Sequence, residues 1–215
     1  QYPKHLKAIY DPPLVLYVKG NILEADILAI AIVGARRCTY YGLSQAERFG
    51  RLLAQKGLCI VRGMARGIDA AAHRGAIGSR GRTIAVLGVM YPRENIELAE
   101  QIVQHGAIVS EFPMNTPPDF RNFPPRNRLI SGLSLGVLVV ESSLKSGSLI
   151  TAQWALEQGK EVFAIPGNID NIYSRGTHKL IKEGAKLVED ITDIIQELGP
   201  IAETLNMSDV PITND

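Results

Sequence analysis

The sequence predicts an α/β protein with a doubly wound, mainly parallel β-sheet and helices on both faces. Two observations carry this prediction. Short apolar runs alternate along the chain with segments of helical spacing, about six times over. The apolar runs are continuous rather than alternating, which is typical of strands that are buried on both faces of a parallel sheet.

Each expected strand is a short apolar run that ends in a glycine or a polar turn. The first is "AIAIVG" at 29–34, and it is followed by "LCIVRG" and "TIAVLG". Runs of this length flanked by turn residues favour strands over helices. The full set of expected strands is 29–34, 58–63, 83–88, 107–112, 136–141, 161–167 and a short one at 185–188.

The expected helices lie between these strands and show apolar residues at helical spacing. The first, 42–57, places Ala46, Phe49 and Leu53 on one face and ends at Gly57, a common helix stop. A proline-rich loop is expected before a short helix at 127–134. The other expected helices span 67–77, 94–106, 148–159, 174–184 and 190–199.

Composition is ordinary for a globular protein, with 46% apolar and 21% charged residues. The longest apolar run has nine residues from Ile27, and a membrane-spanning helix needs about 20. No secretory signal pattern is recognisable near the start. We therefore expect a cytoplasmic protein without a membrane segment, and the missing initiator Met suggests a fragment of a longer chain.

Neither the cysteines nor the histidines form a pattern typical of a cofactor or metal site. Cys38 and Cys59 lie in or beside apolar sequence, which favours reduced core thiols over redox or metal chemistry. The four histidines are far apart and have no zinc-ligand spacing. We expect no metal and no cofactor.

Charge is unevenly distributed although the net charge is only +1. Residues 36–145 hold fifteen basic and eight acidic side chains, whereas 183–215 hold one basic and eight acidic. Arginine dominates the basic segment, and its planar fork suits phosphate. A solvated basic face and an anion-binding surface are equally consistent with this distribution.

Basic residues and glycines follow the expected strands, where ligands bind in doubly wound sheets. A glycine lets the backbone approach a ligand closely, and helix starts bind anions. We expect these side chains to converge on one rim. The basic residues are Arg36, Arg37, Arg62, Arg66, Arg93 and Lys145, and the glycines are Gly34, Gly63, Gly67, Gly88, Gly147 and Gly167.

Each motif also has a purely structural reading. "GARR" at 34–37 does not meet the GxGxxG fingerprint, and no Walker A motif is present. In "KSGSLITA", Ser146 or Ser148 could cap a helix, and this capping role is favoured over anion binding when the motif is taken alone.

Two acids and three tyrosines are further candidates, each with a preferred structural role. Asp69 could be catalytic, but satisfying backbone donors at its own helix start is preferred. Glu141 could be a general base, but an arginine partner is preferred. Exposed tyrosines can stack on bases, but single aromatics are more often core or rim residues; the three considered are Tyr40, Tyr41 and Tyr91.

Taken together, the strand ends predict a phosphate pocket without recognisable machinery for breaking phosphates. Cations spread over many loops fit a nucleic-acid backbone better than one small nucleotide. The segment "NFPPRNRLISG" at 122–132 sharpens this expectation. Its prolines Pro124 and Pro125 would stiffen a loop that holds Arg126 and Arg128 at the rim before a ligand arrives.

Several long motifs resemble the DprA (Smf) family of DNA-processing proteins. They include "GMARGIDAAAHRGAI", "NFPPRNRLISGLSLGVLVVE", "SGSLITA", "ALEQGKEVFAIPG" and "GTHKLIKEGAKLV", and the resemblance covers residues 10–198. It implies an extended Rossmann-like domain that binds single-stranded DNA. It further implies that the protein acts as a dimer and is not an enzyme. It also implies loading of the recombinase RecA during natural transformation, with displacement of single-strand-binding protein.

The resemblance also implies a division of the chain and a set of contact residues. Residues 1–25 would be a remnant of an N-terminal region or linker, 26–198 the DNA-binding domain, and 199–215 an acidic tail. A dimer or RecA contact would include Leu156, Leu180, Ile181 and Lys182. Single-stranded DNA would contact Gly34, Arg36, Arg37, Gly63, Arg66, Gly67, Arg93, Asn122, Arg126, Asn127, Arg128, Lys145, Ser146, Gly147 and Ser148.

The sequence departs from the family pattern at three places in the expected pocket. Ala35 replaces a serine, and the chain is short between Gly88 and Tyr91. Arg62 stands where a small residue is usual, and it would either add charge at the rim or raise a steric conflict there.

A nucleotide-processing enzyme of the phosphoribohydrolase type is the alternative function. It would show a Pro-Gly-Gly-x-Gly-Thr motif with a catalytic glutamate, and this chain has "SGSLIT" without a glutamate instead. A sensor of small nucleotides is the third possibility.

Overall fold

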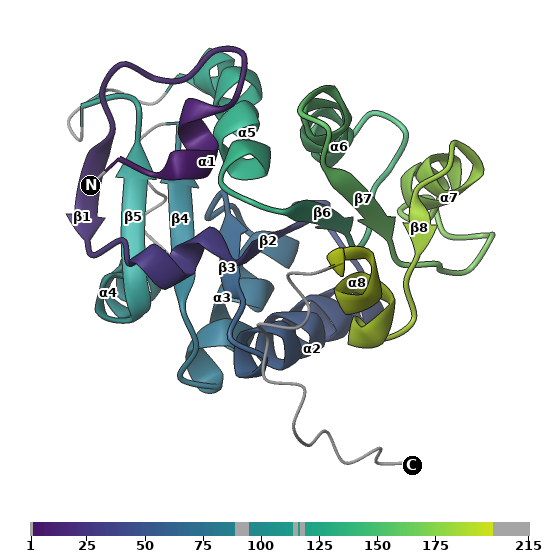
Figure 1. The fold of residues 1–215 in the computed structure, drawn as a ribbon. Helices are drawn as coiled ribbons and strands as arrows, with labels where there is room; N and C mark the ends of the chain where they lie inside the picture. The colour runs from purple at the N-terminus through teal and green to yellow at the C-terminus, as the bar shows by residue number, and fades with distance from the viewer. Residues whose placement is uncertain (1, 89–94, 114–115, 117–118, 200–215) are drawn as a thin grey trace.

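The computed structural model describes residues 2–88, 95–113, 116 and 119–199. Its centre is an eight-stranded sheet in the order β1-β5-β4-β3-β2-β6-β7-β8, and β1 alone of the described strands pairs antiparallel with its neighbour (Figure 1). The predicted doubly wound, mainly parallel sheet is confirmed. The strands are β1 (Tyr17–Gly20), β2 (Ala29–Val33), β3 (Cys59–Arg62), β4 (Thr83–Leu87), β5 (Gly106–Ser110), β6 (Gly136–Val139), β7 (Glu161–Ala164) and β8 (Lys186–Leu187).

Helices cover both faces of the sheet because its central strands are apolar on both sides. In β2, Ile30 and Ile32 pack towards one layer, and Ala29, Ala31 and Val33 pack towards the other. The first layer holds α2 (Tyr40–Gln55), α3 (Ile68–Gly78), α4 (Ile96–His105) and α8 (Ile191–Glu197). The second holds α1 (Lys4–Lys7), α5 (Phe123–Gly132), α6 (Gly147–Glu157) and α7 (Arg175–Lys182).

Helix α5 starts earlier than the sequence predicted. The last part of the expected proline-rich loop is in fact helical: α5 begins at Phe123, and Pro124 and Pro125 lie in its first turn. Proline is tolerated there because the first backbone N–H groups of a helix have no partner within the helix. The prolines therefore fix a helix start and not a free loop.

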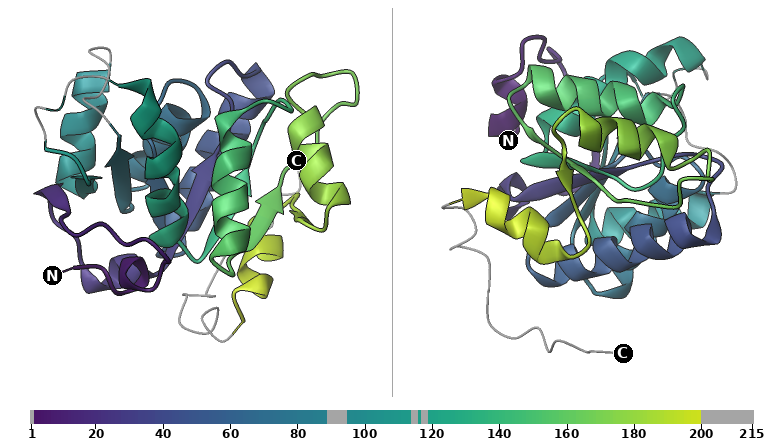
Figure 2. Two further views of the ribbon diagram at one scale, coloured as in Figure 1. Left: turned by 90° about the horizontal axis from the view of Figure 1, so that it is seen from above. Right: turned by 90° about the vertical axis from the view of Figure 1, so that its right-hand side faces the viewer.

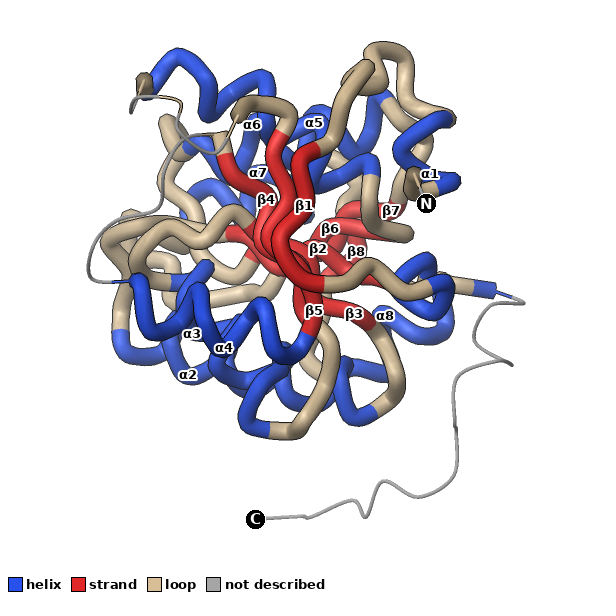
Figure 3. Tube along the Cα trace, turned by 90° about the vertical axis from the view of Figure 1, so that its left-hand side faces the viewer, coloured by secondary structure: helices blue, strands red, loops and turns tan. Residues whose placement is uncertain are grey.

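The N-terminal segment belongs to the sheet and was not predicted as structured. β1 pairs with β5 at one edge, where Figure 3 shows it in front of the other strands. Leu6 of α1 is fully buried in the second layer. The Arg82 guanidinium binds the Asp26 carboxylate and donates to the Asn21 carbonyl at 2.7 Å, which fastens the segment at the amino end of β4.

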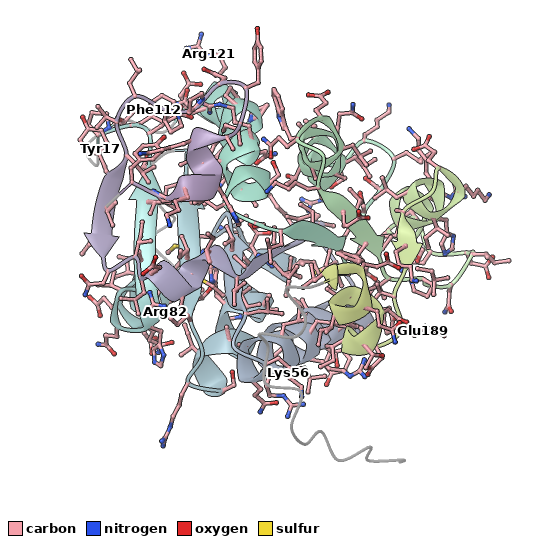
Figure 4. All side chains as sticks on the ribbon, viewed as in Figure 1. Tyr17, Lys56, Arg82, Phe112, Arg121 and Glu189 are labelled. Carbon is pink, nitrogen blue, oxygen red and sulfur yellow. The ribbon has the colours of Figure 1, made fainter. Side chains whose placement is uncertain are left out.

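The two ends of the sheet differ in what they carry. Figure 4 places Arg82 at the amino ends of β4 and β5 and Arg121 at their carboxyl ends. The carboxyl ends carry the loops that sequence analysis selected. No helix in the described part of the chain has the length and apolar character needed to cross a membrane.

Candidate nucleic-acid interface

An open pocket lies at the point where the order of strands in the sheet reverses, between β2 and β6. β2 is flanked by β3 on one side and by β6 on the other, so the connections after β2 and β6 run to opposite layers. Ligands of doubly wound sheets bind at this point, outside the carboxyl ends of the strands. The pocket has a volume of about 430 Å³, and its walls are the loops after β2, β3 and β6, the first turn of α5 and Tyr173.

Two buried guanidinium groups and one carboxylate lie at the base of this pocket, and two of the residues that carry them, Asp69 and Arg126, line it. Arg62 is fully buried; it donates to the Ile68 carbonyl at 2.8 Å and forms an ion pair with Asp69. Asp69 also accepts the N–H of Ala65 at 3.2 Å. Arg126 donates to the carbonyls of Gly63, at 3.0 Å, and Val86. With one carboxylate for two guanidinium groups, this cluster keeps an excess positive charge.

Burial shifts the pKa of both arginines but leaves them charged. The pKa of Arg126 is lowered to about 10, mainly by burial. Asp69 raises this pKa, and the nearby charges of Arg36 and Arg62 lower it. The pKa of Arg62 is lowered by the same desolvation and raised by Asp69. At pH 7 both guanidinium groups are therefore protonated.

The ring of Phe123 lies between a buried and an exposed arginine. The Arg36 guanidinium lies 4.9 Å from the ring centroid and that of Arg126 lies 5.7 Å from it. Both contacts are cation–π interactions, which hold flat cations over an aromatic face. Phe123 thus positions the exposed Arg36 at the pocket. Phe123 opens the "FPPR" segment but was not among the contact residues predicted from sequence.

Serine hydroxyls line the side of the pocket at the start of α6. Ser146 caps this helix, its Oγ lies 2.7 Å from Ser148 Oγ, and Ser148 Oγ lies 3.0 Å from Ser142 Oγ. The amide of Asn127 donates to the Gly147 carbonyl at 3.3 Å and ties α5 to this helix start. The hydroxyl groups and the helix dipole favour an anion at this wall.

Glu141 was expected to pair with an arginine, but among the described residues it binds two loops and forms no ion pair with an arginine. Its carboxylate accepts the Thr39 N–H at 2.8 Å, the Thr39 hydroxyl at 2.6 Å and the Asn171 amide at 3.3 Å. Its carbonyl accepts the Ala35 N–H at 2.8 Å. These bonds set the course of the loop that carries Arg36 and Arg37. Asp69 accepts a backbone N–H, but the donor is Ala65 in the loop before α3 and not a residue at the start of its own helix as preferred; Asp69 also balances Arg62.

The arginines of "FPPRNR" do not stand at the rim as expected. Arg126 is 5% exposed and belongs to the buried part of the pocket lining, so replacing it removes hydrogen bonds of the fold as well as charge. Arg128 is 6% exposed and lies outside the pocket lining. Its guanidinium binds both oxygens of Glu111, at 2.9 and 2.8 Å, and pairs with Asp11 at 3.2 Å. Arg62, expected to add charge at the rim, is buried and paired.

The remaining predicted DNA-contact residues fall into three groups. Those that line the pocket are Gly34, Arg36, Arg37, Asn127, Ser146, Gly147 and Ser148. Those outside its lining are Gly63, which is buried against Arg126 and Asp69, the exposed Arg66 and Lys145, and Gly67 and Asn122. Arg93 lies outside the described residues. Pocket residues that sequence analysis missed include Phe123, Ile150, Thr151 and Tyr173.

The predicted dimer or RecA contact lies on α6 and α7. Leu156 and Lys182 are exposed, Ile181 is partly buried, and Leu180 is buried in the core. In the described part of the chain, no three His, Cys, Asp or Glu side chains gather in a way that could hold a metal ion.

The chain matches the family model "DNA recombination-mediator protein A" over residues 1–199. It belongs to this family. It is 48% identical to the DNA processing protein DprA of Bacillus subtilis over 92% of this chain, and 50% identical to protein Smf of Escherichia coli, also over 92%. It spans 68% and 54% of the lengths of these two family members.

Solved structures of family members share the fold. The DNA processing protein A of Streptococcus pneumoniae superposes with a TM-score of 0.81 at 44% identity, covering 91% of this chain and 70% of that one. The Helicobacter pylori protein, described for its single-stranded DNA binding mode, gives 0.83 at 33% identity, covering 92% and 93%. A molybdenum cofactor binding protein of Rippkaea orientalis shares the fold alone, at 18% identity and a TM-score of 0.56 over 80% and 94% of the chains.

Proposed function

We propose that the chain binds single-stranded DNA in the pocket at the carboxyl ends of β2, β3 and β6. The excess positive charge at the base of the pocket carries the proposal. The carboxylate there, Asp69, pairs with Arg62, whereas Arg126 is bound by backbone carbonyls, and a buried charge that is not balanced by the protein favours an anionic ligand. A solved family member from Helicobacter pylori is described as binding single-stranded DNA, which supports this choice of anion.

The exposed cations at the mouth would contact the phosphates. Arg36 and Arg37 are exposed pocket residues, and Lys145 is exposed on the loop before α6. The phosphate term of single-strand binding gives a slope of log affinity against log salt of about −0.7 per contact. Three contacts would give a slope of roughly −2.

The test is fluorescence anisotropy of labelled thymidine oligonucleotides, single-stranded and duplex, over a salt series. We expect tighter binding of the single strand. Replacement of Arg36 by Ala should lower affinity about tenfold and make the slope shallower by about 0.7, because one charge-assisted phosphate contact is lost. Arg51→Ala is the matched control, since Arg51 is exposed but lies in the fourth turn of α2, away from the pocket lining.

Two outcomes would contradict the proposal. Equal losses for Arg36→Ala and Arg51→Ala would mean that any surface cation serves, and that the pocket is not the site. Tight binding of a mononucleotide with no gain from an oligonucleotide would favour the small-nucleotide sensor.

We further propose that the chain hands its DNA to RecA as a cytoplasmic homodimer, with displacement of single-strand-binding protein during transformation. Membership of a family named for recombination mediation supports this role. The exposed Leu156 and Lys182 on neighbouring helices would contribute to the contact. Sedimentation analysis of the wild type and of Leu156→Glu tests the dimer, and an unchanged mass for the variant would exclude Leu156 from it.

The nucleotide-hydrolase alternative has less support from the pocket. Among the described lining residues, Asp69 is the carboxylate, and it is engaged by Arg62 and by the Ala65 N–H. A general base needs a carboxylate that can reach the substrate. Release of free base from nucleoside monophosphates would overturn this assignment.

A further inference from the structure

We propose that Tyr40 and Ile172 form an exposed platform that stacks an unpaired nucleobase beside the pocket. The inference rests on the proposed DNA-binding function and deepens it, because it assigns a contact to the bases and not to the phosphates. Platform here means the side chains of these two residues.

Glu141 joins the two segments that carry these residues. Its carboxylate binds Thr39 on the loop after β2 and Asn171 on the loop after β7. Tyr40 directly follows Thr39, and Ile172 directly follows Asn171. A second bond joins the same two segments, because the Tyr41 hydroxyl donates to the Pro166 carbonyl at 3.1 Å. Figure 2, in its left-hand view, shows the start of α2 beside the connection from β7 to α7.

Both platform side chains are exposed although both are apolar in bulk. Tyr40 is 86% exposed and Ile172 is 54% exposed. Exposed apolar side chains on two segments that are bonded together could form a continuous apolar surface, and such surfaces indicate sites that a partner covers. The surrounding bonds hold their backbones in place, so little backbone order would be lost when a ligand arrives.

The charges around the platform favour a nucleobase as the partner. Arg36 and Arg37 lie on the same loop as Tyr40, and Tyr173, next to Ile172, lines the pocket. Aromatic side chains beside a phosphate-binding groove stack on bases without regard to sequence, because each base has a π-face. A duplex keeps its bases stacked on one another, so this contact is available only to a single strand.

The experiment compares two oligonucleotides with the same number of phosphates, one of thymidine and one with abasic spacers. We expect wild type to bind the thymidine strand about tenfold more tightly, the value of one base stack on an aromatic side chain. In Tyr40→Ala/Ile172→Ala this ratio should fall towards one while the abasic affinity stays unchanged. Thermal unfolding of each variant verifies that the fold is intact.

The matched control is Tyr17→Ala/Val18→Ala on β1, at the opposite edge of the sheet, where both side chains are also exposed (Figure 4). This variant should keep the wild-type ratio. A platform variant that keeps the ratio overturns the proposal and indicates a protein partner for these side chains. Wild type that binds both strands equally overturns the platform but leaves phosphate binding standing, whereas wild type that binds neither overturns both.

Discussion

Replacement of Asp69 by Asn should destabilise the protein strongly, because it leaves Arg62 charged and buried without an ionic partner. The Arg62 side chain is fully buried and that of Asp69 is 13% exposed. Asn has the shape of Asp but a single acceptor oxygen, so the change removes the charge and also leaves one of the two donors, Arg62 or the Ala65 N–H, without its acceptor. Removing one partner of a buried ion pair costs about 3–5 kcal/mol. Because Asn still accepts one hydrogen bond, we expect about 3 kcal/mol.

Urea unfolding, followed by circular dichroism, measures this loss directly. A domain of this size loses about 2–4 °C of Tm per kcal/mol, so thermal unfolding should shift by roughly 6–12 °C. The exposed pair Lys186–Glu197, at 2.7 Å, provides the control. Glu197→Gln should cost less than about 1 kcal/mol, because water screens an exposed pair.

The double variant Arg62→Met/Asp69→Asn completes the cycle. It removes the buried charge together with its partner, so it should be more stable than Asp69→Asn alone, with a coupling of about 2 kcal/mol or more. Two results would refute the reasoning. One is a cost for Asp69→Asn as small as that of the exposed control, and the other is a double variant whose loss equals the sum of the single losses.

Two further predictions concern buried positions away from the pocket. Burial, with Arg62 and Arg74 nearby, holds the pKa of His73 well below 6.5, so the folded protein keeps this ring neutral while the unfolded chain binds a proton. Stability should therefore fall as the pH drops below about 6.5, and urea unfolding from pH 7 to 5 should show a smaller fall in His73→Gln. Gly75→Ala should cost about 1–3 kcal/mol, because its new methyl group would meet the Glu47 carbonyl where α2 and α3 cross. In thermal unfolding Gly78→Ala, which enters open space in the same helix, should be neutral or slightly stabilising.

The sheet could be predicted from sequence because strands that are buried on both faces consist of consecutive apolar residues. "AIAIV" is an example, because its successive side chains pack alternately into the two cores on either face of the sheet. The edge strand β1 could not be found in this way. Its side chains are mostly exposed, and it is held by main-chain bonds to β5, which is far away in sequence. An edge strand borders solvent on one side, so its sequence carries fewer apolar residues by which it could be recognised.

The pocket's position was predictable, but the role of each arginine in it was not. The rule for doubly wound sheets selects the loops after β2, β3 and β6, and these loops do form the pocket walls. Whether an arginine in such a loop faces the solvent depends on acceptors elsewhere in the chain. Arg128 is drawn away by Glu111 and Asp11, neither of which is recognisable as its partner from spacing alone.

The arginines of the "FPPRNR" helix start therefore act in two different ways. Arg128 is neutralised by carboxylates and stabilises the N-terminal segment against α5. Arg126 is bound by carbonyls, which take hydrogen bonds but cancel no full charge. Its charge therefore persists at the base of the pocket, in surroundings of low dielectric where it acts more strongly than a surface cation would. Through Phe123 it also supports Arg36, so one buried guanidinium both attracts the anion and holds the exposed group that would bind it.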